Sequence, residues 1–243
     1  MTTPTRALIA GASGRTGTEL LSVLRPTDLE VRATTRSFSE IDRLERLGAD
    51  EVVIADFFES ADAVEAVADC DLIFSTLGTP PSPRHTLGGK LVDRTGVSTL
   101  LTAAVAEEVS HVVLQSAIGV GSSKRGLSLP ARLLVRGSLR AKADAERALR
   151  RSGLPYTVVR PGRLTNEPPT GEVVASEGGD SVAGSIPRAD VARVLAAAPF
   201  TPAARNRTFE VVSRRGLSEP PGRLANVDWN CERIGLEPDQ LRA

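Results

Sequence analysis

Three glycines near the start of the chain have a spacing suited to an anionic ligand. Gly11, Gly14 and Gly17 lie between a short apolar run, 7–10, and a segment where leucines recur at helical spacing. One glycine permits the sharp turn out of a strand, one lets backbone approach a ligand, and one lets the helix lie close to the sheet. The free amides and the dipole of that helix favour a pyrophosphate. We therefore predict a dinucleotide site; the alternative is a glycine-rich turn without a ligand.

The end of the expected second strand indicates which dinucleotide binds. No Asp or Glu, which would bond the ribose 2′-hydroxyl of NAD, occurs between Val31 and Ser39. Arg36 stands there instead, and its guanidinium can pair with the 2′-phosphate of NADP. Arg15 in the glycine turn offers a second positive charge. We predict NADP(H) as the cofactor; the alternative is a solvated arginine in an arginine-rich chain.

Few side chains could donate a proton to a substrate. His85 lies in a proline-rich loop after an expected strand, and the ordinary pKa of histidine suits proton transfer. A surface histidine without a catalytic role is the alternative. His111 and Tyr156 each begin an expected core strand, and we expect both to be structural.

The elements that must position these residues alternate regularly. Strands are expected at 7–10, 29–35, 51–55, 71–76, 111–116, 156–160 and 208–212, and helical spacing recurs between them, most extensively over 132–150. This alternation predicts an α/β fold, a Rossmann doubly wound parallel sheet with helices on both faces. We expect residues 1–215 to form one NAD(P)-binding domain with a small irregular C-terminal, substrate-facing part. Segment 119–128 is expected to be a mobile loop, 163–185 a substrate-facing flap, and 216–243 an extended or partly disordered tail.

The composition excludes several classes of function. The 243 residues carry 30 basic and 30 acidic side chains, so we expect no nucleic acid and no membrane as partner. Cys70 and Cys231 are far apart and form no metal-ligand pattern, which leads us to expect no metal and a reducing compartment. No apolar run approaches the roughly 18 residues of a membrane span, and the first strand leaves no room for a signal peptide. We expect a soluble, cytoplasmic monomer or homodimer that acts on a small molecule.

Six motifs occur along the chain: Gly11-Ala-Ser-Gly14-Arg-Thr-Gly17, Ser75-Thr-Leu-Gly78-Thr79, Val112-Val-Leu-Gln-Ser116, Lys142 with Glu146, Ser152-Gly-Leu-Pro-Tyr-Thr-Val-Val-Arg160-Pro161-Gly162, and Arg188-Ala-Asp190-Val-Ala192. Together they resemble the atypical short-chain dehydrogenase/reductase family, and among its branches the NmrA-like and biliverdin-reductase-B-like NAD(P)-binding proteins. The resemblance covers most of the chain and implies a cofactor along the carboxyl ends of the strands.

The resemblance also implies which residues contact the cofactor. Asp56 would bond the adenine edge, although it could instead cap the following helix, and Lys142 would bond the nicotinamide ribose. The full set implied is Gly11, Ser13, Gly14, Arg15, Thr16, Gly17, Arg36, Ser37, Asp56, Phe57, Leu77, Gly78, Thr79, Ser116, Lys142, Pro161, Gly162 and Leu164.

The catalytic pattern of the family is incomplete in this chain. Lys142 fits the lysine of the family's Tyr-x-x-x-Lys motif, but Ser138 occupies the tyrosine position. Ser116 fits the family serine that polarises the substrate carbonyl; its alternative is a strand-end hydroxyl that caps the next loop. The predicted catalytic residues are therefore Ser116, Lys142 and His85.

The missing tyrosine limits the substrates that we expect. Conjugated acceptors such as flavins, quinones or polycyclic ketones ask less of a general acid. The sequence thus predicts an NADPH-dependent oxidoreductase, or reductase, for such an acceptor. A redox-sensing regulator that binds NADP(H) without turnover, and a scaffold with a vestigial nucleotide site, are the alternatives.

Overall fold

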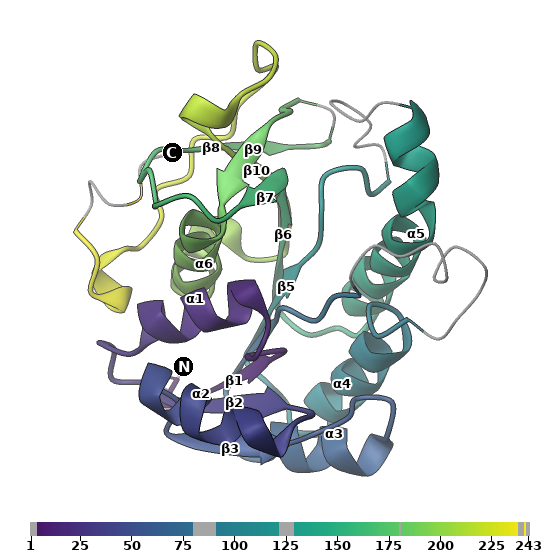
Figure 1. The fold of residues 1–243 in the computed structure, drawn as a ribbon, viewed down its shortest axis with the longest axis vertical. Helices are drawn as coiled ribbons and strands as arrows, with labels where there is room; N and C mark the ends of the chain where they lie inside the picture. Colours follow the sequence, from purple (N-terminus) through teal and green to yellow (C-terminus); the bar gives the residue numbers. More distant parts are fainter. Residues whose placement is uncertain (1–3, 80–90, 122–128, 180, 238–240, 242–243) are drawn as a thin grey trace.

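The computed structural model describes residues 4–79, 91–121, 129–179, 181–237 and 241 (Figure 1). The strands are β1 (Arg6–Ala10), β2 (Glu30–Thr35), β3 (Glu51–Ile54), β4 (Leu72–Ser75), β5 (His111–Gln115), β6 (Tyr156–Pro161), β7 (Arg163–Thr165), β8 (Val173–Glu177), β9 (Ser185–Pro187) and β10 (Arg207–Ser213). The α-helices are α1 (Arg15–Leu24), α2 (Ile41–Leu47), α3 (Ser60–Val67), α4 (Thr95–Ala106), α5 (Leu129–Arg151) and α6 (Arg188–Ala197).

The main sheet has the order β3-β2-β1-β4-β5-β6-β10-β8, and every pairing in it is parallel except that of β8 with β10. The predicted Rossmann fold is confirmed. The chain runs outward from β1 in both directions, to β2 on one side and β4 on the other. Such a switch point leaves a crevice at the carboxyl end of β1, which is where ligands bind in this class of fold.

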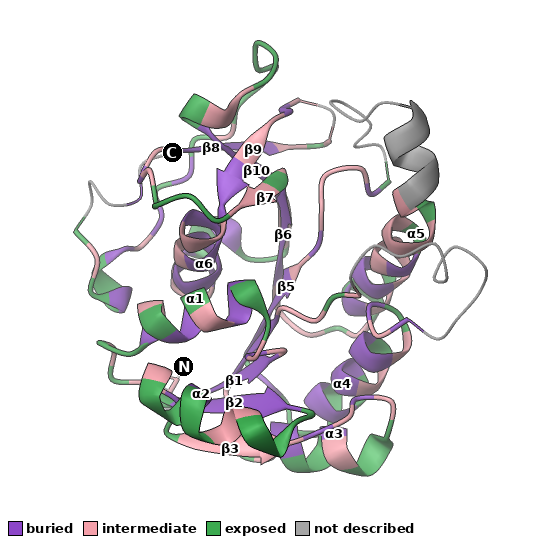
Figure 2. Ribbon diagram, in the orientation of Figure 1, coloured by how far each residue is buried: buried purple, intermediate pink, exposed green. Residues whose placement is uncertain are grey.

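The sheet is packed on both faces because apolar side chains point to both sides of most of its strands. Within β1, Ala7 and Ile9 join one core cluster while Leu8 and Ala10 join the other, as the period of two in a strand requires. Helices α1, α2 and α6 cover the first face and α3, α4 and α5 the second (Figure 1). In Figure 2 the central strands and the inner helix faces are mainly buried, β3 is intermediate, and the outer helix faces are mainly exposed.

The expected flap at 163–185 contains more regular structure than its sequence indicates. The buried run Val173–Glu177 forms the edge strand β8, and β7 pairs with β9 in a small separate sheet. Gly171 and Gly178, both at positive φ, bound β8. The proline- and glycine-rich composition of the segment hides this strand, because the apolar run is only a few residues long.

The segment after Gly216 is mostly irregular, yet it packs against the core. Trp229 is 3% exposed, and its ring meets Phe209 of β10 edge-on, with centroids 5.5 Å apart. Val227, Cys231 and Ile234 are buried in the same cluster. The described part of this segment therefore covers the α1/α6 face of the sheet.

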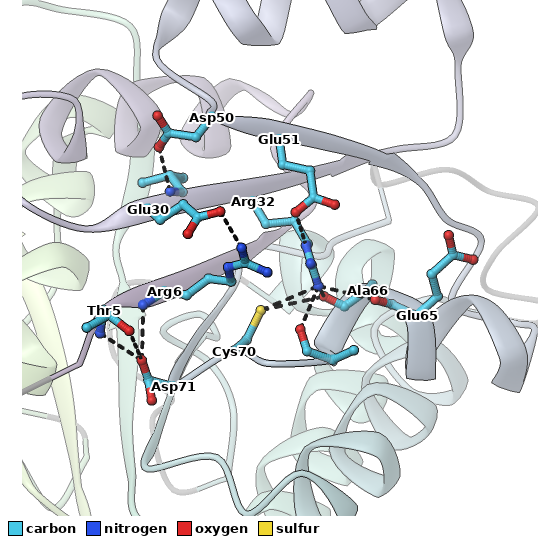
Figure 3. A network of polar contacts seen from close by, with 12 residues as sticks. Thr5, Arg6, Glu30, Arg32, Asp50, Glu51, Glu65, Ala66, Cys70 and Asp71 are labelled. Carbon is cyan, nitrogen blue, oxygen red and sulfur yellow. Dashed lines mark hydrogen bonds and ion pairs between the residues drawn. The ribbon is translucent and has the colours of Figure 1, made fainter. Parts of the chain in front are cut away.

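A polar network fastens α3 to the sheet (Figure 3). Arg32 of β2 is buried and donates to Glu51 at 2.7 Å and to the carbonyls of Ala66 and Ala68 at 3.0 and 2.7 Å. Its charge thus satisfies carbonyls at the carboxyl end of α3. Burial raises the pKa of the nearby Cys70 thiol to about 11, so this thiol stays protonated and unreactive at neutral pH. We therefore assign the network a structural role. Among the described helices, none is long and apolar enough to cross a membrane.

Candidate functional site

The glycine turn joins β1 to α1 at the switch point of the sheet. Gly11 has φ of 88°, and a Cβ there would lie 3.1 Å from Thr76 Oγ1 and 3.2 Å from the Leu77 nitrogen. Thr76 in turn donates to the carbonyls of Ala10 and Gly11, each at 3.1 Å. The end of β1 therefore rests directly on the segment that follows β4.

The other two glycines differ in what surrounds them. A Cβ on Gly17 would lie 2.4 Å from the Gly11 carbonyl oxygen, so α1 can approach the turn only with glycine at this position. A Cβ on Gly14 would meet only that oxygen, at 3.2 Å, and Gly14 is exposed. Gly17 is required by packing, whereas Gly14 leaves an open approach to the backbone.

The start of α1 fits an anionic group. No side chain caps this helix at Gly14, and its first turn contains no acidic residue. Free N–H groups and the positive end of the helix dipole are therefore presented at the switch point. Ser13 is partly exposed and Thr16 is buried beside them. The cradle matches the pyrophosphate of a dinucleotide.

Three arginines lie at the ends of elements near this turn: Arg15 begins α1, Arg36 follows β2 and Arg188 begins α6. Arg36 is exposed just after β2 and makes no hydrogen bond or ion pair with the described residues, whereas Ser37 Oγ pairs with Ser39 Oγ at 2.8 Å. Arg188, at the start of α6, donates to the carbonyl of Thr165 at 3.1 Å. Burial, and then repulsion from nearby Arg15, lower the pKa of Arg188. The region thus has a surplus of positive charge.

Asp56 and Phe57, which follow β3, make local contacts within the protein. Asp56 Oδ1 accepts the N–H of Phe58 at 3.1 Å, and its own N–H donates to Asp62 Oδ2 at 2.8 Å. Asp56 therefore organises the entry to α3. Phe57 is 3% exposed and belongs to the core cluster under α4. The Phe57 ring is therefore held in the core, where an apolar ring is more stable than in water, and its contact with adenine stays a prediction.

A narrow crevice lies between the end of β4, the end of β5 and α5. Its lining includes the predicted Leu77, Ser116 and Lys142 and also Asp93, which the sequence analysis missed. Lys142 Nζ lies 2.8 Å from Asp93 Oδ1, and the Thr79 N–H donates to Asp93 Oδ2 at 2.7 Å. Asp93 precedes α4 in a segment without a motif, so only its position in the fold indicates a role.

Ser116 is engaged in a buried ion-pair network. Its hydroxyl donates to Glu146 Oε1 at 2.6 Å, and Arg160 binds both oxygens of that carboxylate at 2.9 and 2.7 Å. Burial alone would raise the pKa of Glu146, but bonds and charge from Arg160, with bonds from Ser116 and Arg150, lower it. The carboxylate therefore stays ionised, and it accepts the one hydrogen bond that the Ser116 hydroxyl can donate. In this arrangement the Ser116 proton is directed at Glu146, as in the alternative of a structural hydroxyl, and the role of Ser116 toward a substrate carbonyl stays a prediction.

The remaining predicted residues have mainly structural surroundings. Gly162 is required because a Cβ there would lie 2.4 Å from the Gly184 carbonyl oxygen; Pro161 ends β6 and Leu164 lies in β7. Burial lowers the pKa of His111 to about 4, and its Nε2 contacts Thr157 Oγ1 at 3.0 Å. His111 is thus structural. His85 lies outside the described residues. The described residues contain no group of three potential metal ligands.

Comparison with known proteins agrees with this geometry. Residues 11–202 match the model of a family described as NAD(P)H-binding. The chain is 32% identical over 210 residues to the uncharacterized sugar epimerase YhfK of Bacillus subtilis, covering 85% of this chain and 93% of that protein.

Two solved structures show the same architecture. A putative NAD-dependent epimerase/dehydratase from Bacillus halodurans superimposes with a TM-score of 0.76 at 30% identity, covering 89% of this chain and 96% of that one. The anaerobillin reductase ChuY of Escherichia coli O157:H7 superimposes with a TM-score of 0.76 at 24% identity, covering 90% and 100% of the two chains. The second likeness shows the fold alone.

Proposed function

The chain belongs to the NAD(P)H-binding family, and from that premise we propose that it is an NADPH-dependent oxidoreductase of the atypical short-chain type. Its acceptor is a small conjugated molecule of the flavin, quinone or polycyclic ketone kind. The observation that supports NADPH is Arg36, exposed and unpaired among the described residues at the end of β2, with no acidic residue in that strand end. A guanidinium there attracts a 2′-phosphate, which a carboxylate would repel.

In this proposal, different residues of the chain bind different parts of the cofactor. The first turn of α1 binds the pyrophosphate, Arg36 and Arg15 bind the 2′-phosphate, and Lys142 bonds the nicotinamide ribose. The bound nicotinamide supplies a hydride. Apolar side chains that line the crevice beside Lys142, among them Leu77 and Ala145, exclude water from its buried side.

The proposed substrate class follows from the proton donors that are not available. By the family resemblance, Ser138 occupies the tyrosine position of the Tyr-x-x-x-Lys motif, and a serine hydroxyl is a poor acid near neutral pH. Ser116 already donates its proton to Glu146. An acceptor that spreads the incoming charge over a conjugated system needs less help from an acid in the transition state.

The cofactor part is tested by fluorescence titration with NADPH and NADH. NADPH is expected to bind at least about tenfold more tightly, which corresponds to about 1.4 kcal/mol. Arg36→Ala should remove that preference and leave NADH binding nearly unchanged. Arg46→Ala, on the exposed face of α2, is the matched control and should change neither constant. Equal affinities in the wild-type protein would refute the assignment.

The turnover part is tested by NADPH oxidation at 340 nm against two panels of acceptors. Flavins, quinones and conjugated polycyclic ketones should be reduced, and simple aliphatic ketones poorly. Preference for simple ketones would reveal a proton donor that the proposal omits, and His85 would be the first residue to mutate. Tight NADPH binding without net oxidation would instead favour the non-consuming alternatives, a redox-sensing regulator or an epimerase.

We also propose that the protein acts in the cytoplasm, on a small molecule, as a monomer or homodimer. Cys70 and Cys231 are buried free thiols, which suits a reducing compartment. Light scattering after size-exclusion chromatography measures the oligomeric state.

A further inference from the structure

Asp93 connects three parts of the chain that the sequence keeps apart. It precedes α4, accepts the backbone N–H of Thr79 after β4 at 2.7 Å, and lies 2.8 Å from Lys142 Nζ on α5. Its side chain is 1% exposed and that of Lys142 is 16% exposed. A buried carboxylate with two such partners holds both in fixed positions.

The pair is placed against the segment 77–79. A Cβ built on Gly78 would lie 3.8 Å from Asp93 Oδ1 and 3.9 Å from Lys142 Nζ. The other described residues that line this crevice are uncharged, namely Leu77, Val97, Leu114, Gln115, Ser116 and Ala145. In so enclosed a place an ammonium without a partner would be unfavourable, and Asp93 supplies the opposite charge.

The neighbouring ion pair provides a natural comparison. Arg94, next in the chain, pairs with Asp144 of α5 at 2.8 Å, but these side chains are 58% and 30% exposed. Both pairs join the start of α4 to α5. The Asp93–Lys142 pair differs because it lies in the crevice, where water screens its charges least.

We propose that Asp93 is a positioning residue that fixes and neutralises Lys142, so that this pair sets the relative affinity of the site for NADP⁺ and NADPH. The inference rests on the proposed function, in which Lys142 bonds the nicotinamide ribose. The oxidised nicotinamide ring carries a positive charge and the reduced ring carries none. A neutral pair favours neither form, whereas a single remaining charge would favour one of them.

The test measures the dissociation constants of NADP⁺, by calorimetry, and NADPH, by fluorescence, at one ionic strength. Asp93→Asn leaves Lys142 uncompensated and should raise the ratio of the NADP⁺ to the NADPH constant by about three- to tenfold. Lys142→Met leaves Asp93 uncompensated and should lower the ratio by a similar factor. The double variant should return the ratio to near its wild-type value. Opposite signs of this kind cannot arise from a general loss of structure.

Two controls separate this charge effect from damage to the fold. Asp144→Asn should leave the ratio unchanged, because it removes the exposed pair on the same helix. Adenosine 2′,5′-bisphosphate lacks the nicotinamide half, so its affinity should change less than about twofold in every variant. If Asp93→Asn does not fold, the decrease in the ratio on Lys142→Met still tests the proposal.

The outcomes that overturn the proposal are distinct from those that refute the function. A wild-type protein that binds neither nucleotide refutes the proposed function. Wild-type binding with an unchanged ratio in both single variants, or with a shift in the same direction in both, overturns the role of Asp93 alone.

Discussion

At the scale of single residues, the hydrogen-bond partners decide which side chains remain available for chemistry. Ser116 and Lys142 both line the crevice, but Ser116 donates its only proton to Glu146, whereas Lys142 forms an ion pair with Asp93 and has three N–H donors. The serine is thereby part of a structural network, and the lysine keeps donors for a ligand. The buried side chains of Ser116 and His111 should each contribute measurably to stability.

Removing the Ser116 hydroxyl should affect stability more than catalysis. Ser116→Ala leaves Glu146 without one of its donors, which should lower the free energy of unfolding by about 1–3 kcal/mol and kcat by less than about tenfold. Glu146→Gln should destabilise more, by about 3–5 kcal/mol, because the buried Arg160 then loses its hydrogen-bonded carboxylate and keeps only the longer contact to Glu210 at 3.9 Å. Urea denaturation and steady-state kinetics measure both. A loss in kcat above about 100-fold with wild-type stability in Ser116→Ala would show that this serine acts on the substrate.

His111 should make the protein less stable as the pH falls below neutrality. Burial lowers its pKa from 6.5 to about 4 in the folded state, so the unfolded chain takes up a proton first. The contribution is fully present above pH 6.5 and is lost as the pH falls toward 4, on the order of 3 kcal/mol in all. Urea denaturation at a series of pH values should show this slope, and His111→Asn should flatten it. An equal slope in the variant would contradict the assignment.

At the scale of elements, close backbone approaches fix how strands and helices meet at the site. The glycine turn brings α1 onto the end of β1, and Gly162, Gly184 and Gly216 bring three further segments into contact. A Cβ on Gly184 would lie 2.1 Å from the Gly216 carbonyl oxygen. Gly17, Gly162, Gly184 and Gly216 are needed for close packing of the backbone, whereas Gly14 has open space beside it, which suits the approach of a ligand.

Gly14 and Gly17 should separate these two reasons. Gly17→Ala forces a Cβ to within 2.4 Å of backbone, so it should destabilise the protein by about 1–3 kcal/mol and weaken NADPH binding. Gly14 has φ of −73°, which alanine adopts readily. Gly14→Ala should therefore change stability little and weaken NADPH binding at least as much. Denaturation and titration of both variants measure the difference, and equal destabilisation would contradict it.

At the scale of the whole molecule, the C-terminal segment completes the core on the α1/α6 face. Trp229 is the single tryptophan, and its ring contacts Phe209 of β10, the penultimate strand in the order of the main sheet. The face of β10 that carries Phe209 would otherwise expose a large apolar area to water. The Rossmann domain therefore depends for stability on residues beyond its last strand.

Trp229→Ala should lower the free energy of unfolding by about 3–5 kcal/mol, because it removes a large side chain that is 3% exposed. Leu224→Ala, in the same segment but 43% exposed, should change it by less than about 0.5 kcal/mol. Circular dichroism is the appropriate probe, since Trp229→Ala removes the only tryptophan fluorophore. Similar stability of the two variants would show that the segment is not part of the core.

The sequence by itself determined the fold class, the order of the elements and the glycine turn. These depend on local patterns: apolar runs of strand length, leucines at helical spacing, and glycines where a turn is sharp. The absence of an acidic residue around Arg36 is likewise a local property that the sequence shows directly, and the NADP(H) preference inferred from it stays a prediction. Even so, the buried edge strand β8 was missed, since its apolar run lies within a proline- and glycine-rich segment.

Only the tertiary structure decided which partners each polar side chain has. Ser116 and Glu146 are 30 residues apart, and Asp93 meets Thr79 and Lys142 only when α4 and α5 are placed on the sheet. It also placed Phe57 in the core and Trp229 over the sheet. Whether a hydroxyl donates to a substrate or to a carboxylate depends on its neighbours in space. Those neighbours are set by the packing of elements that are distant in the sequence, and a local sequence pattern does not show how such elements pack.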